Sequence, residues 1–245
     1  MKKTGLEVVT IDNFYENLQN PLAQELFTGL LLLRAEGYGP DYPKSFLPYD
    51  VVDFVAIHHL FCIRENQKLT PVGAFRQMLL SRADFYKLTL PIYKLAKESR
   101  SEPHILAVEK LIKSHRGAKT DLLYSSSFTI KKTLRGERHL TDTIKELVPA
   151  LTLHDLKTHN IGSTLGGSAL RFKTDSLFEK WGYSPIQWNG VPLPPVKKVS
   201  AENELVLIMH FEKMKPYAEE CLNKQRSLIE NRILISTALP EKAAA

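Results

Sequence analysis

The pattern of apolar and polar positions predicts several helices. The run PLAQELFTGLLLLRAEGY, from Pro21 to Tyr38, is typical of a helix, because proline suits the first helical position and Asn20 suits the position before it. In RGERHLTDTIKELVPAL the apolar residues recur at helical spacing and predict a second helix with one apolar face. Further helices are expected over 101–115 and 216–235, and in a segment that ends with LFEKWGY, where glycine suits a helix stop.

Residues that favour strands fill the segments between these helices. DFVAIHHLFCIR (53–64) and VGAFRQMLLS (72–81) flank a polar turn and predict an antiparallel hairpin. DLLYSSSFTI (121–130) and ELVLIMHFE (204–212) are also predicted strands, and a weaker strand pattern covers 163–170. This order of helices and strands predicts an α/β or α+β layered domain.

Length and composition bound the class of protein. With 245 residues, 43% of them apolar and 24% charged, the chain suits one large globular domain or one domain with an appendage. No apolar run reaches about 18 residues and no secretory signal is recognisable, so we expect a cytoplasmic protein without a transmembrane segment. The two cysteines are too few for a disulfide framework. We expect an N-terminal extension over 1–19, a main domain over 20–212, and a C-terminal helix and tail over 213–245.

The positive charge favours acidic partners. The formal net charge is +6 and the pI is about 9.1, which suits nucleic acid, anionic lipid, a phosphorylated cofactor or an acidic carrier protein. The segment TLRGERHLT lies between a predicted strand and a predicted helix, and Lys131, Lys132, Arg135 and Arg138 surround it with positive charge. A helix N-terminus offers free backbone amides to phosphate. A solvated basic turn is the alternative interpretation.

Two motifs together resemble the GNAT superfamily of N-acyltransferases: RGERHLTDT at 135–143, after a strand, and LFEKWGY at 177–183, ending a helix. The resemblance implies a GNAT-like mixed, mostly antiparallel central sheet flanked by helices, here with an added C-terminal helix. It also implies that the first motif binds the pyrophosphate of acyl-coenzyme A, while the strand before it splays from its neighbour and pairs with the pantetheine arm. The cofactor-binding residues implied are Phe128, Thr129, Ile130, Arg135, Gly136, Glu137, Arg138, His139, Leu140 and Thr141.

The motifs depart from that superfamily at three positions. Arg138 and Leu140 stand where its second and third glycines would allow backbone to approach phosphate closely. Phe178 stands where a tyrosine usually protonates the departing thiolate. Phenylalanine has no proton to give, so another group or water protonates the thiolate, or the chemistry is different.

The front half resembles one branch of the superfamily, the autoinducer synthases and long-chain N-acyl amino acid synthases. The segments are LLLRAEGYG, LPYDVVDFVAIHHLF and TPVGAFRQMLL. By position they imply an acceptor site of Arg34, Asp50, Asp53 and Arg76. The chemistry is compatible, because paired carboxylates hold an ammonium and an arginine can fork onto a carboxylate. In the alternative interpretation the aspartates cap or turn the chain and Arg76 is a surface strand residue.

Attack by an amine requires a general base. His58, His59 and Tyr124 lie on predicted strands, and strand alternation places the two histidines on opposite faces. We take Tyr124 and His58 as the candidate catalytic residues. Tyr124 and Ser127 also stand roughly where autoinducer synthases carry a glutamate and an arginine. His154 and His159 are poorly spaced for a shared helical metal site, and we expect no metal.

The leading hypothesis is an N-acyltransferase that uses direct attack, without a covalent enzyme intermediate. The donor would be acetyl-CoA, a longer acyl-CoA or an acyl carrier protein, and the acceptor a small-molecule amine or an amino acid. A non-catalytic acyl-CoA-binding module is the alternative, supported by Phe178 and the missing glycines. A nucleic-acid-binding domain is less favoured, since few aromatic residues accompany the basic ones. Monomer and homodimer both remain open.

Overall fold

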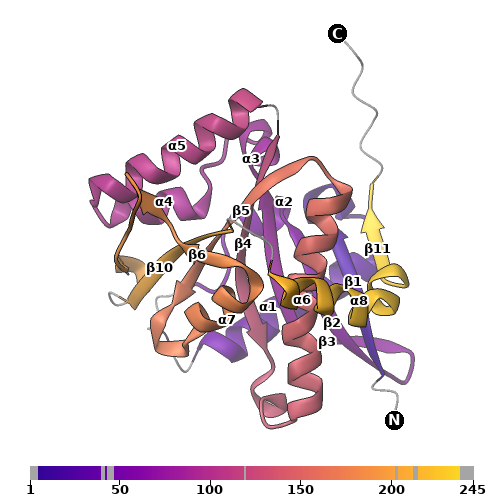
Figure 1. Cartoon of the computed structure of the whole chain (residues 1–245). Coiled ribbons are helices and arrows are strands. Elements are labelled where there is room, and N and C mark those ends of the chain that lie inside the picture. Colours follow the sequence, from indigo (N-terminus) through magenta and orange to yellow (C-terminus); the bar gives the residue numbers. More distant parts are fainter. Residues whose placement is uncertain are drawn as a thin grey trace.

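A computed structural model of the chain describes residues 5–39, 42, 47–118, 120–201, 204–211 and 215–237. Within these residues, nine strands form one mixed sheet in the order β11-β1-β2-β3-β4-β5-β10-β6, with β9 added beside β10 (Figure 1). Neighbouring strands are antiparallel except in the pairs β1–β11 and β4–β5. The strands are β1 (Leu6–Asp12), β2 (Ile57–Glu65), β3 (Lys68–Leu79), β4 (Asp121–Ile130), β5 (Ile161–Ala169), β6 (Tyr183–Pro185), β9 (Val196–Lys198), β10 (Glu204–Phe211) and β11 (Ile233–Ser236), with β7 (Gln187–Trp188) and β8 (Val191–Pro192) in a separate ribbon.

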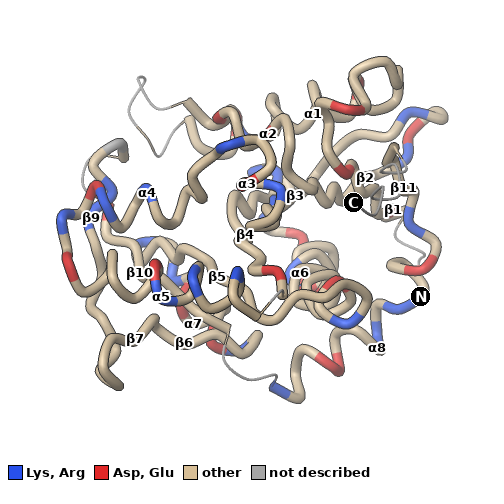
Figure 2. The backbone as a smooth tube through the Cα atoms, turned by 90° about the horizontal axis from the view of Figure 1, so that it is seen from above, with Lys and Arg blue, Asp and Glu red and all other residues tan. Residues whose placement is uncertain are grey.

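Helices cover both faces of this sheet, as the view from above shows (Figure 2). One face carries α6 (Arg138–Thr158), α7 (Thr174–Trp181) and α8 (Pro216–Glu230), which share one apolar core. The other carries α1 (Pro21–Tyr38), α2 (Val52–Val55), α3 (Leu80–Phe85), α4 (Pro91–Glu98) and α5 (Glu102–Ala118). Short 3₁₀ turns occupy Phe14–Asn17, Lys132–Leu134, Leu170–Phe172 and Val199–Ala201. No helix in the described ranges is both long and apolar enough to cross a membrane.

The sequence around β2 reflects burial on both faces. Leu60 and Cys62 pack toward α1, whereas Phe61 joins the core under α6. Because neighbouring strand residues point to opposite faces, a strand covered on both sides needs an almost continuous apolar run. His58 and His59 interrupt that run and are nevertheless buried. Each therefore needs polar partners inside the protein.

Several predicted elements are confirmed by the structure. Helix α1 begins at Pro21, and the Asn20 side chain accepts hydrogen bonds from the backbone amides of Leu22 (3.0 Å) and Ala23 (3.1 Å). Strand β4 covers the whole predicted segment 121–130. Gly182 ends α7 with φ of 111°, the left-handed conformation expected of the glycine in LFEKWGY.

The boundaries of the predicted hairpin and of the last helix were wrong. Residues 52–55 form a helical turn rather than the start of a strand, and the Asp50 carboxylate accepts a hydrogen bond from the amide of Val52 (2.9 Å) at its beginning. The last helix ends at Glu230, and Ile233 to Ser236 form β11 instead. Pairing with β1 overrides the helical spacing of this segment, in which Ile233 and Ile235 are β-branched and favour a strand. Strand β1 and helix α4 were not predicted.

Both ends of the chain contribute to the central sheet. Strand β1, within the predicted N-terminal extension, pairs with β2, and β11, within the predicted C-terminal segment, pairs with β1. These two strands form one edge of the sheet, with α8 on one face and α1 on the other (Figure 1). The sheet that positions the site below is thus built from the full described length of the chain.

We expect Asn20→Ala to lower the free energy of unfolding by about 1 kcal/mol, because two amides of the first turn of α1 lose their acceptor. Urea unfolding followed by circular dichroism measures this change. Asn20→Asp keeps an acceptor oxygen and should stay close to the unsubstituted protein. Equal losses in both variants would contradict the capping role.

Candidate active site

Strands β4 and β5 separate partway along their length. Their parallel pairing runs from Asp121 opposite Ile161 to Ser125 opposite Gly166 and then stops. Beyond that point β4 stays with β3, while β5 stays with β10. Within the described residues, the second half of β4 therefore has no strand on its β5 side. Its backbone groups on that side are open to another partner.

A bulge in β4 lies at the opening of this gap. Ser126 pairs with Arg76 and Thr129 with Ala74, so two residues of β4 stand opposite Phe75 alone. Ser127 takes φ of 57°, which is uncommon for a residue other than glycine. Such bulges redirect side chains and backbone groups, and they are frequent beside active sites.

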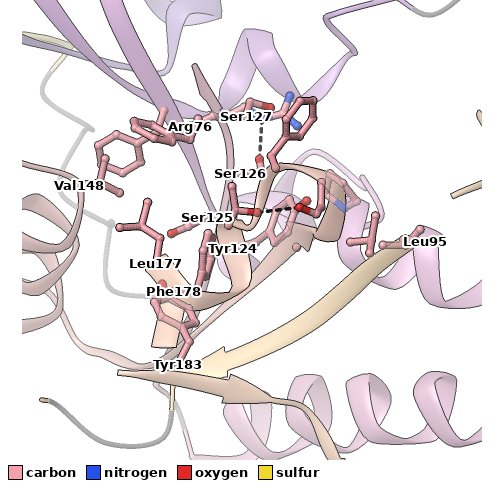
Figure 3. A pocket seen from close by; sticks show the side chains of 18 of the residues that line it. Arg76, Leu95, Tyr124, Ser125, Ser126, Ser127, Val148, Leu177, Phe178 and Tyr183 are labelled. Carbon is pink, nitrogen blue, oxygen red and sulfur yellow. Dashed lines mark hydrogen bonds between the residues drawn. The ribbon is translucent and has the colours of Figure 1, made fainter. Parts of the chain in front are cut away.

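A cavity of about 540 Å³ reaches both faces of the sheet through the gap. This size suits a small-molecule site. Its charged half lies toward α2, α4 and β9 and includes Asp50, Asp53, Arg76, Lys94, Glu98, Lys198 and Glu204. Its apolar half lies under α6, α7 and α8 and includes Val148, Leu153, Leu156, Leu177, Phe178, Trp181, Phe211 and Ala218. Figure 3 shows Arg76 and Ser126 at one end, joined by a hydrogen bond, and Phe178 and Tyr183 at the other.

The four acceptor residues implied by sequence resemblance form one cluster, in which Asp50, Asp53 and Arg76 line the charged half and Arg34 is buried behind them. The Asp53 carboxylate contacts Arg34 Nη1 at 2.5 Å and Arg76 Nη1 at 2.9 Å. Arg76 Nη1 also contacts Asp50 at 2.8 Å. Burial alone would raise the pKa of Asp53, but the Arg76 and Arg34 guanidiniums outweigh it and hold that pKa well below its usual range. Asp53 is thus a fixed negative charge, and the half-exposed Asp50 carboxylate faces the cavity.

The two candidate catalytic residues differ in their access to the cavity. Tyr124 lines it, and burial raises the pKa of its phenol, which therefore stays protonated at neutral pH. His58 is fully buried, does not line the cavity, and has Nε2 2.7 Å from the Asp53 carbonyl oxygen. Burial and the nearby Arg34 charge lower the pKa of His58 to about 3. His58 is therefore neutral, and it contacts Asp53 of the ion-pair cluster on the side away from the cavity.

The predicted cofactor residues lie along the end of β4 and the start of α6. Phe128 lines the cavity, and Arg135 Nε donates to the Ile130 carbonyl oxygen at 3.3 Å. The helix begins at Arg138 with no side-chain cap on its first amides. The side chains of residues 135–139 are exposed, so an anion can reach them. Leu140 and Thr141 are buried and could meet a ligand only through their backbone.

Several residues of the cavity were not predicted from the sequence. Lys198 follows a proline-rich stretch without periodicity, and only the pairing of β9 with β10 places it opposite Glu204. Burial lowers the pKa of Lys198, whereas Glu204 opposes that change. Glu204 also binds Arg171 (2.7 Å) and accepts a hydrogen bond from Tyr42 (2.7 Å). Tyr183 did carry a signal, because it closes the LFEKWGY motif.

Phe178 lies directly on the gap. A Cβ atom placed on Gly166 would lie 2.4 Å from Cε1 of Phe178, so glycine is required for this close approach. Gly166 is also the last β5 residue paired with β4. The ring that replaces the superfamily's usual tyrosine thus packs where the two strands part.

We expect the free energy of unfolding to fall as pH drops below about 6.5, the ordinary histidine pKa. His58 takes up a proton near that pH in the unfolded chain but only near pH 3 in the folded one. Between these values the unfolded state binds the additional proton, and each pH unit costs about 1.4 kcal/mol. Urea unfolding at pH 7 and pH 5 measures the loss. His104 and His115 shift in the same direction, so the difference between the protein and His58→Gln isolates His58. The same pH dependence in both would contradict this role.

Comparison with known proteins supports the fold. Neither a model of a protein family nor a curated sequence matches the chain. Among solved structures it resembles BjaI, a CoA-dependent acyl-homoserine lactone synthase solved with SAM and isopentyl-CoA and also with MTA. In both cases the TM-score is 0.51 and the identity 13%, over 98% of this chain and 97% of that one. It also resembles the AHL synthase LasI, with a TM-score of 0.50 and 14% identity over 95% of this chain and 98% of that one. The mixed, mostly antiparallel sheet flanked by helices that the sequence predicted is confirmed, and acyl-homoserine lactone synthases share this fold.

Proposed function

We propose that the protein is an N-acyltransferase that moves an acyl group from a thioester to the amine of an amino acid. The observation that carries this proposal is the gap between β4 and β5, which opens into one cavity with an apolar half and a charged half. A thioester placed in the gap would have its acyl chain on one side and an attacking amine on the other. BjaI, a protein of similar fold, was solved with isopentyl-CoA.

The donor would lie along the open edge of β4. The Ser127 bulge interrupts the regular pairing of β4 with β3. Backbone amides near it could polarise the thioester carbonyl, as an oxyanion hole does. The exposed Arg135 and Arg138, beside the start of α6, could bind the coenzyme phosphates. The same site would accept the phosphopantetheine arm of an acyl carrier protein.

The apolar half suits an acyl chain longer than acetyl. Its walls are aliphatic and aromatic side chains of α6 and α7, and Ala218 of α8 also lines it. Apolar area removed from water stabilises a complex by about 25 cal/mol per Å² before the costs of ordering. A bound acyl chain of several methylenes would therefore be favoured here over acetyl.

The charged half suits an acceptor that carries both an ammonium and a carboxylate. Asp50 and Glu98 could hold the amine, and Lys198 could pair with the carboxylate. Asp50, Asp53 and Ser126 already bind Arg76. Protonated Tyr124 would act here as a hydrogen-bond donor rather than as a base. A carboxylate such as Asp50, directly or through one water, is the better acceptor for the proton that the amine loses.

The distribution of charge gives no support to nucleic acid as the partner. In Figure 2 basic and acidic residues are interspersed along the backbone, and the basic residues do not gather in one region. A protein that tracks a phosphate backbone needs its positive charge gathered in a patch or stripe.

We expect acetyl-, octanoyl- and palmitoyl-CoA to raise the thermal midpoint, with the two longer chains giving the larger shift. A ligand at 100 times its dissociation constant stabilises the folded state by about 2.7 kcal/mol.

Replacing both Arg135 and Arg138 by alanine should weaken acyl-CoA binding at least tenfold, since charge-assisted hydrogen bonds to phosphate are lost. An octanoyl thioester of N-acetylcysteamine lacks the nucleotide, and its binding should not change in this variant. Binding without turnover would favour the non-catalytic module, and no shift with any thioester would overturn the proposal.

We expect Lys198→Met to raise the KM for amino acid acceptors about 10- to 100-fold, as loss of a charged hydrogen bond would. The KM for the corresponding amino acid amides should stay within about threefold, because they carry no carboxylate. Lys197→Met is the matched control, since the side chain of Lys197 is exposed. Steady-state kinetics with both acceptor series measures the effect, and equal losses for acids and amides would contradict the assignment.

A further inference from the structure

The hydroxyl of Tyr183 lies on the same side of the sheet as Phe178 and close to the point where β4 and β5 part. Tyr183 lines the cavity, and its ring centre is 4.9 Å from that of Phe178. Its hydroxyl is 3.1 Å from Thr164 Oγ1. Burial raises the pKa of Tyr183, and Thr164 and the side chain of Ser125, the last β4 residue paired with β5, oppose that rise. Tyr124, by contrast, follows the alternation of β4 and lies on the opposite face, with Arg76.

A buried chain of polar groups leads from His59 through Gln77 to Ser125. The Gln77 amide oxygen lies 2.9 Å from His59 Nε2, so Gln77 Nε2 is turned toward Thr152 Oγ1 (3.0 Å) and, at a longer 3.5 Å, toward Ser125 Oγ. His59 is itself held by Thr10 (3.1 Å) and Asp155 (3.4 Å). An amide nitrogen only donates, so the Ser125 oxygen accepts and its proton is directed elsewhere.

The order of donors leaves the Tyr183 proton available. Ser125 can donate to the Tyr183 oxygen, and the Tyr183 proton then points to Thr164 or to a ligand in the cavity. Because the surrounding wall is apolar, a hydrogen bond formed there is stronger than one in water. Burial raises the pKa of Tyr183 to about 12, which keeps the phenol protonated across the physiological range.

We propose that Tyr183 is the hydrogen-bond donor to the thiolate that leaves in the transfer reaction, in the role that Phe178 cannot fill. This inference rests on the proposed function. The acceptor nitrogen attacks the thioester carbonyl carbon and a C–N bond forms. The C–S bond then breaks, and its electron pair stays on sulfur, where the Tyr183 O–H donates to it. The proton lost by the amine leaves through Asp50 or solvent, and the released thiolate takes a proton from solvent.

Hydrogen bonding fits this site better than full proton transfer. A thiol has a pKa near 8.5, so a phenol that titrates near 12 would transfer its proton uphill. Donation without transfer still stabilises the charge that develops on sulfur, in the way that oxyanion-hole donors stabilise oxygen. Gln77 and His59 act as positioning residues, because they orient Ser125 and do not reach the cavity as donors to sulfur themselves.

The test compares donors whose thiols differ in acidity. With octanoyl N-acetylcysteamine thioester, Tyr183→Phe should lower kcat about 10- to 100-fold and leave KM within about threefold, because a charged hydrogen bond is lost only as sulfur departs. With octanoyl thiophenyl ester, whose thiol is more acidic, the loss should stay below about threefold. A purely structural role would lower kcat for both donors alike, and that result would overturn the inference. So would an unchanged kcat with the alkyl thioester.

Two controls separate this inference from folding and from the proposed function. Tyr217→Phe removes a phenol on α8 outside the cavity and should leave both donors unaffected. Adding Phe178→Tyr to Tyr183→Phe restores a hydroxyl on the neighbouring ring and should recover part of kcat. Free coenzyme A gives a readout without turnover: the ultraviolet absorbance of its bound thiolate should titrate at higher pH in Tyr183→Phe, and an identical titration would count against the inference. If the unsubstituted protein binds no thioester at all, the proposed function fails instead.

Discussion

The separation of β4 from β5 is the feature on which the rest of the site depends. Strands in a sheet satisfy their backbone groups by pairing, and an unpaired interior edge is costly unless another partner takes its place. Here pairing ends at Ser125 and Gly166, each strand continues with its outer neighbour, and the Ser127 bulge adds to the divergence. Phe178 packs onto Gly166, at the point where the two strands part. The open edge and the cavity therefore have one structural origin.

The same gap joins two chemically different environments. Because side chains alternate along β4, Tyr124 and Ser126 face the charged helical layer, whereas Ser125 faces the apolar one. Elsewhere the sheet keeps these layers apart, with separate cores under α6 and under α1. A ligand that spans the gap could meet fixed charges at one end and an apolar wall at the other. The proposed transfer of an acyl group from a thioester to an amine depends on this arrangement.

Buried polar groups on both sides of the sheet show that stability is not optimised here. Arg34 and Asp53 are almost completely buried, and Arg34 keeps two nitrogens without a hydrogen-bond partner among the described residues. Replacing a buried ion pair by apolar residues is often neutral or stabilising, although removing one partner costs about 3–5 kcal/mol. His59 and Gln77 form a second buried polar group on the opposite face. Proteins depart from good packing rules mainly where function requires it.

The sequence by itself determined the elements whose signals are local. Asn20 before Pro21 predicted the start of α1, the strand-forming residues of 121–130 predicted β4, and Gly182 predicted the end of α7, since caps and strand patterns act over a few residues. Only the tertiary structure decided the elements that depend on distant partners. Ile233 to Ser236 became a strand because the edge of β1 was open, and Lys198 reached the cavity because β9 pairs with β10. The role inferred for Tyr183 likewise depends on Thr164 and Ser125, which approach it only when the sheet is assembled.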